Sequence, residues 1–204
     1  GANTIVPLLI LDSNVDSTAD GKGGSIVFQE LSAYANTAEI SAARLGGGGS
    51  SEVKFKLRNT DVMALNSNGY VTKPLQPAFL ATKTSTSSNA AINTDHTVLF
   101  PTEVYDQNND FSSNTFTAPV TGKYLLTASL RLDQVDEAAN YYLLGIIGSN
   151  RNFREMWNPG GITDNDSYHN MQVSGLLDMD ANDTAIVRFN QSAGNPQVDQ
   201  DGNA

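Results

Sequence analysis

The sequence of 204 residues contains no cysteine, which excludes a disulfide framework, a thiol nucleophile and a cysteine-ligated zinc site. Its formal net charge of −10 disfavours binding to nucleic acid, because attraction to phosphates needs a basic face. Only 39% of the residues are hydrophobic and 17% are charged, and the abundance of Gly, Ser, Thr, Asn and Asp suits short strands and turns better than helices.

The first 75 residues do not have the pattern of a globular domain. Short β-like runs at 4–11, 25–29, 52–57 and 62–65 are separated by glycine-rich turns, and each is too small to build a core. The stretch 30–44 fits either a short helix or an extended segment, and we expect irregular structure or a strand. A flexible linker is the simplest interpretation of so many glycines. This region contains more apolar side chains than a linker needs, which argues against that interpretation. Phe28, Phe55 and Met63 are examples.

Four phrases follow one another between Gly24 and Thr72: Gly-Ser-Ile-Val-Phe-Gln-Glu, Ala-Glu-Ile-Ser-Ala-Ala-Arg, Val-Lys-Phe-Lys-Leu-Arg-Asn-Thr-Asp and Met-Ala-Leu-Asn-Ser-Asn-Gly-Tyr-Val-Thr. Their order resembles the shaft repeats of phage tail fibres. Each phrase is degenerate, so the order is what carries the resemblance. It implies an interwoven homotrimer in which three chains share strands, and this would explain why one chain lacks a core here.

A short connector separates this region from the rest. Two prolines within Pro74-Leu75-Gln76-Pro77 oppose both helix formation and strand pairing. We therefore predict two domains, a fibre shaft at 1–75 and a head at 76–204.

The head contains the most informative stretch of the chain, at 98–132. Gly122 begins an alternation in which every second residue from Tyr124 to Leu132 is apolar, typical of a half-buried strand. Pro119 and the pair Thr121-Gly122 mark the turn before it. From this turn we expect Phe116 and Tyr124 to face each other across a hairpin.

The same stretch resembles the signature of the C1q domain. The matching residues are Phe100, Asp106, Phe111, Phe116, Gly122 and Tyr124. Only four residues separate Phe111 from Phe116, so that hairpin should be tighter than in the family. The resemblance implies a C1q/TNF-like jelly-roll sandwich, although the chain lacks the closing Ser-Gly-Phe type strand of such domains. We expect an all-β protein, an N-terminal extended trimeric β shaft followed by this sandwich.

The run 141–148 is apolar on both faces of a strand, which an antiparallel sheet with one wet face does not need. A second covering surface is expected, most simply another subunit. We predict that Tyr142, Leu144 and Ile146 contribute to a trimer interface. The alternative is a covering loop of the same chain.

The loop 155–169 and its flanks hold the candidate ligand-binding residues. They combine the only tryptophan with basic, acidic and aromatic side chains that suit sugar faces and hydroxyls: Arg151, Arg154, Trp157, Asp164, Asp166 and Tyr168. Trp157 is equally well interpreted as a packing anchor.

Nothing in the sequence indicates catalysis. His96 and His169 lie far apart in the sequence, and no HExxH, GxSxG or P-loop pattern occurs. Asp178, Asp180 and Asp183 superficially resemble a calcium loop, but the glycine and the distal glutamate of an EF-hand are missing. A solvated turn is the better interpretation. We predict no metal site and no cofactor, while calcium bound between subunits by acidic loops, such as the one with Asp133, Asp136 and Glu137, stays open.

The two resemblances together imply a non-enzymatic structural and host-recognition part of a phage tail fibre or similar virion appendage, acting as a homotrimer. Its expected partners are other virion or fibre proteins on the N-terminal side and a host cell-surface glycan or protein. Nucleic acid is not an expected partner. Membrane insertion is not expected either, since no apolar run approaches the roughly 18 residues that cross a bilayer. The expected location is the virion, outside the cell. The alternative is a secreted or cell-surface bacterial C1q-like lectin or adhesin, and an enzyme acting on polysaccharide is a third possibility.

Overall fold

The computed structural model describes residues 23–30, 35–45, 50–162 and 168–202. These residues form strands and turns and contain no helix, so none of them forms a helix that could cross a membrane. The chain divides into two compact units, Gly1–Gln76 and Pro77–Ala204, with the division one residue after the expected boundary. Each unit is described separately below.

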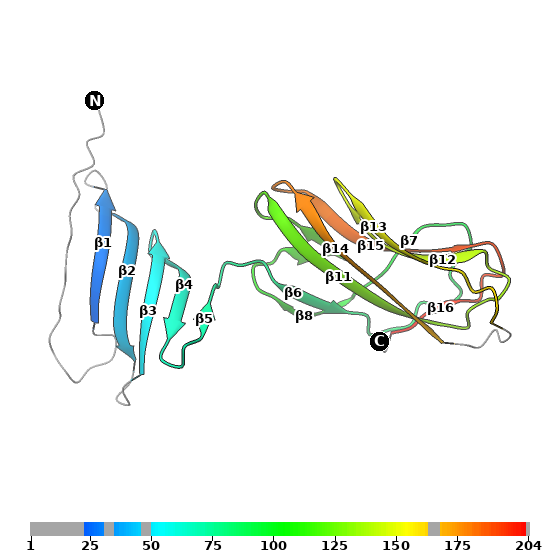
Figure 1. Cartoon of the computed structure of the whole chain (residues 1–204), viewed down its shortest axis with the longest axis horizontal. Helices are drawn as coiled ribbons and strands as arrows, with labels where there is room; N and C mark the ends of the chain where they lie inside the picture. Colours follow the sequence, from blue (N-terminus) through cyan, green and yellow to red (C-terminus); the bar gives the residue numbers. More distant parts are fainter. Residues whose placement is uncertain (1–22, 31–34, 46–49, 163–167, 203–204) are drawn as a thin grey trace, which may run out of the picture. The chain divides into compact units, whose positions relative to one another are not determined.

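The N-terminal unit is one antiparallel sheet (Figure 1). Its strands pair in chain order: β1 (Gly23–Glu30), β2 (Ala35–Leu45), β3 (Ser50–Leu57), β4 (Thr60–Asn66) and β5 (Val71–Thr72). Three of the predicted strands fall in β1, β3 and β4, and most of the uncertain stretch 30–44 is strand β2. The predicted strand 4–11 lies outside the described residues.

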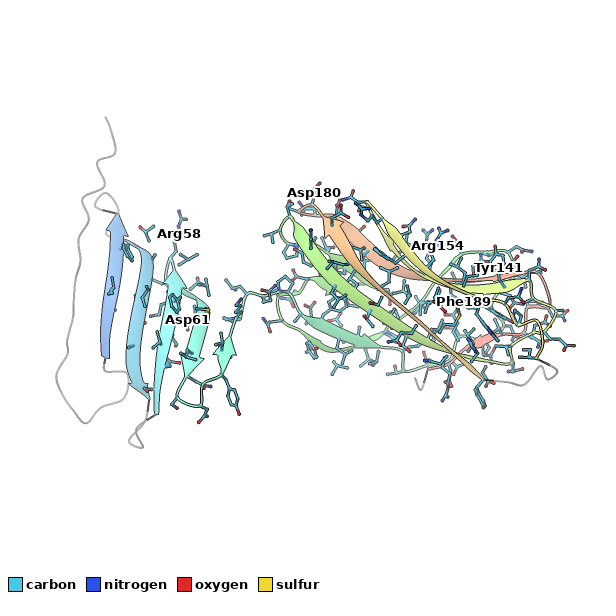
Figure 2. The ribbon with its side chains drawn as sticks, viewed as in Figure 1. Arg58, Asp61, Tyr141, Arg154, Asp180 and Phe189 are labelled. Atoms are coloured by element: carbon cyan, nitrogen blue, oxygen red, sulfur yellow. The ribbon has the colours of Figure 1, made fainter. Side chains whose placement is uncertain are left out.

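A two-residue turn joins β3 to β4. Arg58 and Asn59 both have positive φ, at 47° and 66°, between the paired residues Leu57 and Thr60. Two positive φ values in a two-residue loop match the twist of the flanking strands. Figure 2 shows Arg58 at this turn and Asp61 just beyond it.

One face of this sheet is apolar. Cross-strand partners lie on the same face, and the register aligns Ile26 with Ile40, Ile40 with Phe55, and Phe55 with Met63. Val53 pairs with Leu65 in the same way. None of the residues of this unit whose burial the structure describes is buried. Within the described part of this unit, the sheet therefore has an apolar face but no buried core.

The opposite face is charged. Lys54 forms ion pairs with Glu52 at 2.8 Å and with Asp61 at 3.0 Å, and Lys56 pairs with Glu39 at 3.2 Å. The carboxylates of Glu52 and Asp61 raise the pKa of the Lys54 ammonium. The charged face suits contact with water, whereas the apolar face does not.

The C-terminal unit is a β-sandwich. One sheet has the order β13-β12-β15-β10-β9, with β7 also paired to β15, and the other has the order β14-β11-β16. A separate pair, β6 and β8, lies beside them. The strands are β6 (Phe79–Thr82), β7 (His96–Thr97), β8 (Thr102–Asp106), β9 (Phe111–Ser112), β10 (Thr115–Thr117), β11 (Gly122–Asp133), β12 (Tyr141–Gly148), β13 (Asn152–Trp157), β14 (His169–Met179), β15 (Thr184–Ser192) and β16 (Asp199–Gln200). β11 and β14 pack against β12 of the other sheet (Figure 1).

The expected alternation on β11 is confirmed. Ala128, Leu130 and Leu132 are buried, while Thr127 and Ser129 are exposed. The inward residues pack into one core together with Phe116 of β10 and with Phe189 of β15. This core lies entirely within the C-terminal unit.

The tight hairpin at Phe111 and Phe116 is also present. Phe111 pairs with Phe116 across β9 and β10, and Ser113 and Asn114 form the turn with φ values of 51° and 63°. The carboxylate of Asp106 accepts the backbone N–H of Phe111 at 2.8 Å and so fixes the preceding loop.

The predicted hairpin between Phe116 and Tyr124 is wrong. Their rings do touch, with centroids 5.2 Å apart. However, β10 pairs with β15 whereas β11 pairs with β14, so the contact joins the two sheets of the sandwich. The turn at 118–121 crosses from one sheet to the other.

The predicted role of Tyr142, Leu144 and Ile146 needs correction. All three side chains face into the core of their own chain, with exposures of 0%, 0% and 2%. Another subunit cannot reach them without opening the sandwich. The apolar residues on the outer face of β12 are instead Tyr141, Leu143 and Ile147, which are partly exposed. The sequence pattern identifies a strand with two apolar faces but does not say which of them points inward.

Candidate recognition surface

The candidate ligand-binding residues do not form one site. Arg151 precedes β13 and Trp157 ends it, so six residues of extended chain, roughly 20 Å, separate them. Arg154 lies between them on the outer side of the strand, opposite Gly145 (Figure 2). Asp164 and Asp166 lie outside the described residues. The described candidates therefore belong to two different ends of the sandwich.

The end that contains Arg151 is a network of turns. Arg151 forms an ion pair with Asp178, in which one nitrogen lies 3.0 Å from Oδ2. This pairing lowers the pKa of Asp178 to about 2. Asn150 donates to Asp183 Oδ2 at 2.9 Å, and the same oxygen accepts the backbone N–H of Asp180.

These contacts explain the acidic cluster that resembled a calcium loop. Asp178 is engaged by a guanidinium, and Asp183 closes a turn. No group of three His, Cys, Asp or Glu side chains arranged to hold a metal ion occurs among the described residues. In the loop at Asp136, the carboxylate likewise accepts backbone N–H groups, from Ala138 and from Asn195.

The end that contains Trp157 is an aromatic stack. The indole lies 3.5 Å from the ring of His169 and 5.5 Å from the ring of Tyr142, measured between centroids, and both pairs are nearly parallel. Trp157 is partly buried and packs against the core. This arrangement favours the structural interpretation of Trp157 that the sequence left open.

Burial sets the protonation state of His169. It lowers the pKa of the imidazole below its usual value of 6.5, and the nearby carboxylate of Glu155 opposes this shift. The neutral form of the imidazole is therefore favoured in this partly buried position against the indole of Trp157.

Tyr168 is the candidate that presents the most ring surface to a ligand. Its side chain is 66% exposed. The guanidinium of Arg131 lies 5.3 Å from the centroid of its ring, within the range of a cation–π contact. Arg131 is fixed on its other side by an ion pair with Asp201. The exposed ring of Tyr168 can stack on a sugar face, and the oriented guanidinium of Arg131 can donate hydrogen bonds to the hydroxyl groups of that sugar.

Sequence reasoning missed Arg131. It sits on the polar face of β11, where the alternation alone assigns it to solvent, and only the pairing of β11 with β14 brings it close to Tyr168. Asn170 is its direct partner across the two strands and belongs to the same surface. We call Arg131, Tyr168 and Asn170 the Tyr168 surface.

Comparisons with known proteins find likeness among solved structures, at low sequence identity. No protein-family model and no curated protein matches the sequence. Among solved structures, the chain is similar to the globular domain of zebrafish complement 1qA protein, with 18% sequence identity and a TM-score of 0.43. The match covers 61% of this chain and 91% of that chain.

Proposed function

We propose that this chain is a non-enzymatic structural and recognition component of an extracellular homotrimeric fibre, of the kind found as a phage tail fibre or virion appendage. The N-terminal unit supplies the shaft and the C1q-like sandwich supplies the ligand-binding head. The alternation on β11, the two-sheet sandwich and the six signature residues support the C1q-like assignment of the head.

The observation that carries the proposal is the apolar face of the N-terminal sheet, which remains exposed among the residues that the structure describes. Phe28 and Leu57 are 54% and 55% exposed on it, beside Ile40 and Leu65. A single sheet layer is stable only when its apolar face packs against another layer. Contiguous exposed apolar surface of this kind marks an interaction site. A second and a third copy of the same sheet would provide matching apolar surfaces.

The head has a smaller apolar surface that fits the same arrangement. Leu125 of β11 and Leu176 of β14 are direct cross-strand partners on the outer face, with exposures of 71% and 54%. Burying both against another copy would remove them from water. Three heads joined in this way would present three Tyr168 surfaces, and avidity would strengthen individually weak ligand contacts.

The solution mass of the intact chain tests the assembly. Light scattering should give about three times 21.8 kDa. A monomer at micromolar concentration would contradict the shaft, and a stable dimer would contradict the trimer while keeping the apolar face as an interface.

Glycan binding tests the recognition role. We expect the intact protein to bind a subset of cell-surface glycans on an array, and Tyr168→Ala to weaken that binding about tenfold at each site. Tyr105→Ala is the matched control, because Tyr105 is also an exposed tyrosine of the head but lies on β8. Equal loss in both variants, or no glycan binding by the trimer, would contradict the role of this surface.

A further inference from the structure

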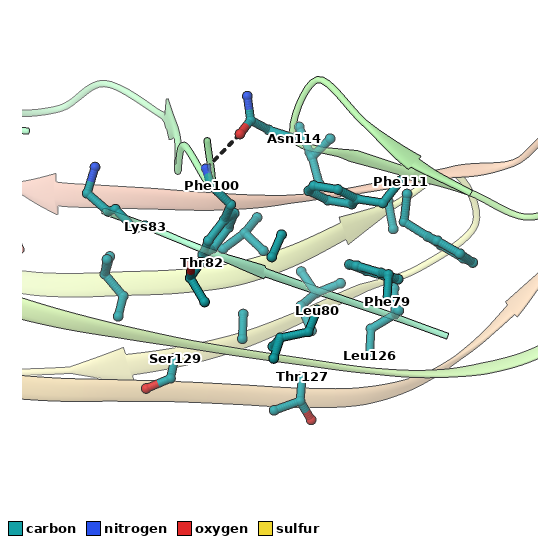
Figure 3. Close-up of a pocket in the computed structure, with 18 of the residues that line it drawn as sticks. Phe79, Leu80, Thr82, Lys83, Phe100, Phe111, Asn114, Leu126, Thr127 and Ser129 are labelled. Carbon is teal, nitrogen blue, oxygen red and sulfur yellow. Dashed lines mark hydrogen bonds between the residues drawn. The ribbon is translucent and has the colours of Figure 1, made fainter. Parts of the chain in front are cut away.

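The groove between β6 and β11 offers little to a charged ligand. It has a volume of about 460 Å³ and is lined mainly by apolar side chains, among them Phe79, Phe100 and Phe111 (Figure 3). Lys83 is the only basic residue among the described residues that line it. Lys83 is 5% exposed, and its ammonium donates to Ser87 Oγ at 2.6 Å. The exposed cations of this unit lie instead on the outer faces of the sandwich.

Three residues form one row across the outer face of the β13-β12-β15 sheet. Gly145 lies between the inward-facing Leu144 and Ile146 of β12, so its position faces outward. Its cross-strand partners are Arg154 on β13 and Arg188 on β15. Adjacent strands lie roughly 4.8 Å apart, so the Cα atoms of the two arginines are about 10 Å apart. We call Arg154, Gly145 and Arg188 the arginine row.

The glycine in the middle lets the two arginines approach each other. A Cβ atom at Gly145 would lie 3.3 Å from Cγ of Arg154 and 3.2 Å from Cδ1 of Ile147. The aliphatic stem of Arg154 therefore leans over β12, in the direction of Arg188. No side chain at the middle position separates the two guanidinium groups.

Both arginines can accept a further anion. Arg154 is exposed, and within the described part of the chain no carboxylate forms an ion pair with it. Arg188 has one long ion pair, in which Nη1 lies 3.4 Å from Oδ2 of Asp95 and the two side chains are 41% and 55% exposed. Exposed pairs contribute little to stability. A guanidinium carries five N–H donors, so Arg188 keeps donors for a ligand.

The side chains next to the arginine row are uncharged. Leu143 and Ile147 flank Gly145 along β12, and both are partly exposed. Asn190 is the cross-strand partner of Leu143, and Asn152 is that of Ile147. Aliphatic groups can pack against the C–H groups of a sugar ring, and amides both donate to hydroxyl groups and accept from them. These neighbours therefore suit a sugar that carries an anionic group.

The charge of the whole head narrows the class of anion. From Pro77 onward the sequence has six Lys and Arg against fifteen Asp and Glu. This excess disfavours a dense polyanion, which would bring many further negative charges close to an acidic surface. A single carboxylate meets the two local guanidinium groups without that repulsion. Its planar shape also matches the fork of arginine donors.

From this geometry we propose that the arginine row binds the carboxylate of an acidic sugar, such as a uronic acid of a cell-surface glycan. Arg154 binds one side of the carboxylate and Arg188 the other, while the ring rests on Leu143 and Ile147. The arginine row and the Tyr168 surface lie on different sheets, so they are separate contacts. That the anion belongs to a sugar rests on the proposed recognition role, whereas binding of a carboxylate does not.

A matched pair of ligands tests the proposal on the intact protein. Methyl glucuronide and methyl glucoside differ only in the carboxylate that replaces a hydroxymethyl group. Titrations followed by saturation-transfer NMR measure weak binding of such small sugars. We expect the glucuronide to bind about tenfold more tightly than the glucoside. Salt at about 1 M should remove most of this difference, because it screens exposed charges.

Three variants locate the binding. Arg154→Gln should weaken glucuronide binding about tenfold and leave glucoside binding unchanged, because it removes the charge and keeps much of the stem. Gly145→Ala should also weaken glucuronide binding, since the added Cβ displaces the stem of Arg154. Arg58→Gln is the matched control. It removes the same charge from the N-terminal unit and should leave the binding unchanged.

Three outcomes would overturn the inference. Equal weakening by Arg154→Gln and Arg58→Gln would mean that net charge attracts the ligand. Loss of glucuronide binding in Tyr168→Ala but not in Arg154→Gln would place the sugar at the Tyr168 surface, and the recognition role would stand without this site. If inorganic sulfate displaces the glucuronide at equal concentration, the row binds anions without recognising a sugar acid. Glucuronide binding that depends on Arg154, in a protein that binds no glycan on an array, would support the carboxylate site and contradict the recognition role.

Discussion

Trp157 lies in a stack of three rings at one end of the sandwich. It contacts Tyr142, whose side chain is fully buried, and His169, which begins β14. The stack links β12, β13 and β14 and so joins the two sheets. Stacked aromatic pairs contribute beyond the area that they bury.

Trp157→Ala should therefore destabilise the head. Replacing a fully buried tryptophan with alanine costs more stability. Because this ring is only partly buried, we expect the free energy of unfolding to fall by about 2 kcal/mol. Chemical denaturation followed by circular dichroism measures it. Trp157→Phe, which keeps a ring in the stack, should lose much less. If glycan binding disappears while stability is unchanged, Trp157 contacts ligand directly and its packing role is minor.

His169 should make stability depend on pH. Burial lowers the pKa of its imidazole in the folded state, so the unfolded state binds a proton more readily. The stabilisation is complete above the usual value of 6.5 and is lost as the pH falls through the folded pKa. Melting temperatures measured from pH 7.5 downward should fall in this window. The fall should be smaller in His169→Gln than in the parent chain.

His96→Gln provides the matched control for that measurement. Its ring nitrogen lies 2.8 Å from the carbonyl oxygen of Ala91, and it is not one of the three stacked rings. A pH profile that flattens equally in both variants would mean that the dependence does not come from burial of His169.

At the scale of elements, the N-terminal sheet has a partly exposed apolar face, and no residue of described burial in this unit is buried. Strand alternation separates its apolar side chains from its lysines and carboxylates, and the registers of β2, β3 and β4 align them into two faces. Phe55 lies at the centre of the apolar face, between Ile40 and Met63. Its burial against other copies would contribute about 2 kcal/mol per chain.

Phe55→Asp should dissociate the proposed homotrimer, because the carboxylate would have to be buried without a partner. Light scattering should shift from the mass of three chains to that of one. Ser41→Asp is the control: Ser41 lies on the charged face as the cross-strand partner of Lys54 and should leave the mass unchanged. Dissociation by Ser41→Asp as well would assign the interface to the wrong face.

At the scale of the whole molecule, the two units differ in whether they can fold alone. Among its described residues, the C-terminal unit has a contiguous core of 20 buried apolar residues, all of them after residue 89. In the N-terminal unit, no residue of described burial is buried. Independent stability of a domain requires its own core.

A fragment covering residues 77–204 should therefore unfold cooperatively as a monomer. Its thermal transition, followed by circular dichroism, should not depend on concentration, whereas that of the intact chain should rise with concentration because assembly is coupled to folding. A fragment that fails to fold alone would mean that the head depends on the shaft.

The sequence by itself determined the features that depend on neighbouring residues. Alternation on β11 identified its buried face, the paired prolines located the joint between the units, and the short spacing between Phe111 and Phe116 predicted the tight hairpin. These signals are local, because side-chain period and turn chemistry act over a few residues. The all-β class followed from the same patterns.

Only the tertiary structure decided what depends on how distant strands pair. Tyr142, Leu144 and Ile146 face the core, and Phe116 and Tyr124 lie on opposite sheets. The guanidinium of Arg131 lies beside the ring of Tyr168. Strand alternation states that two faces differ, but which face points inward is set by sheet order and by what packs on each side. That information resides in long-range pairing, so no window of the sequence contains it.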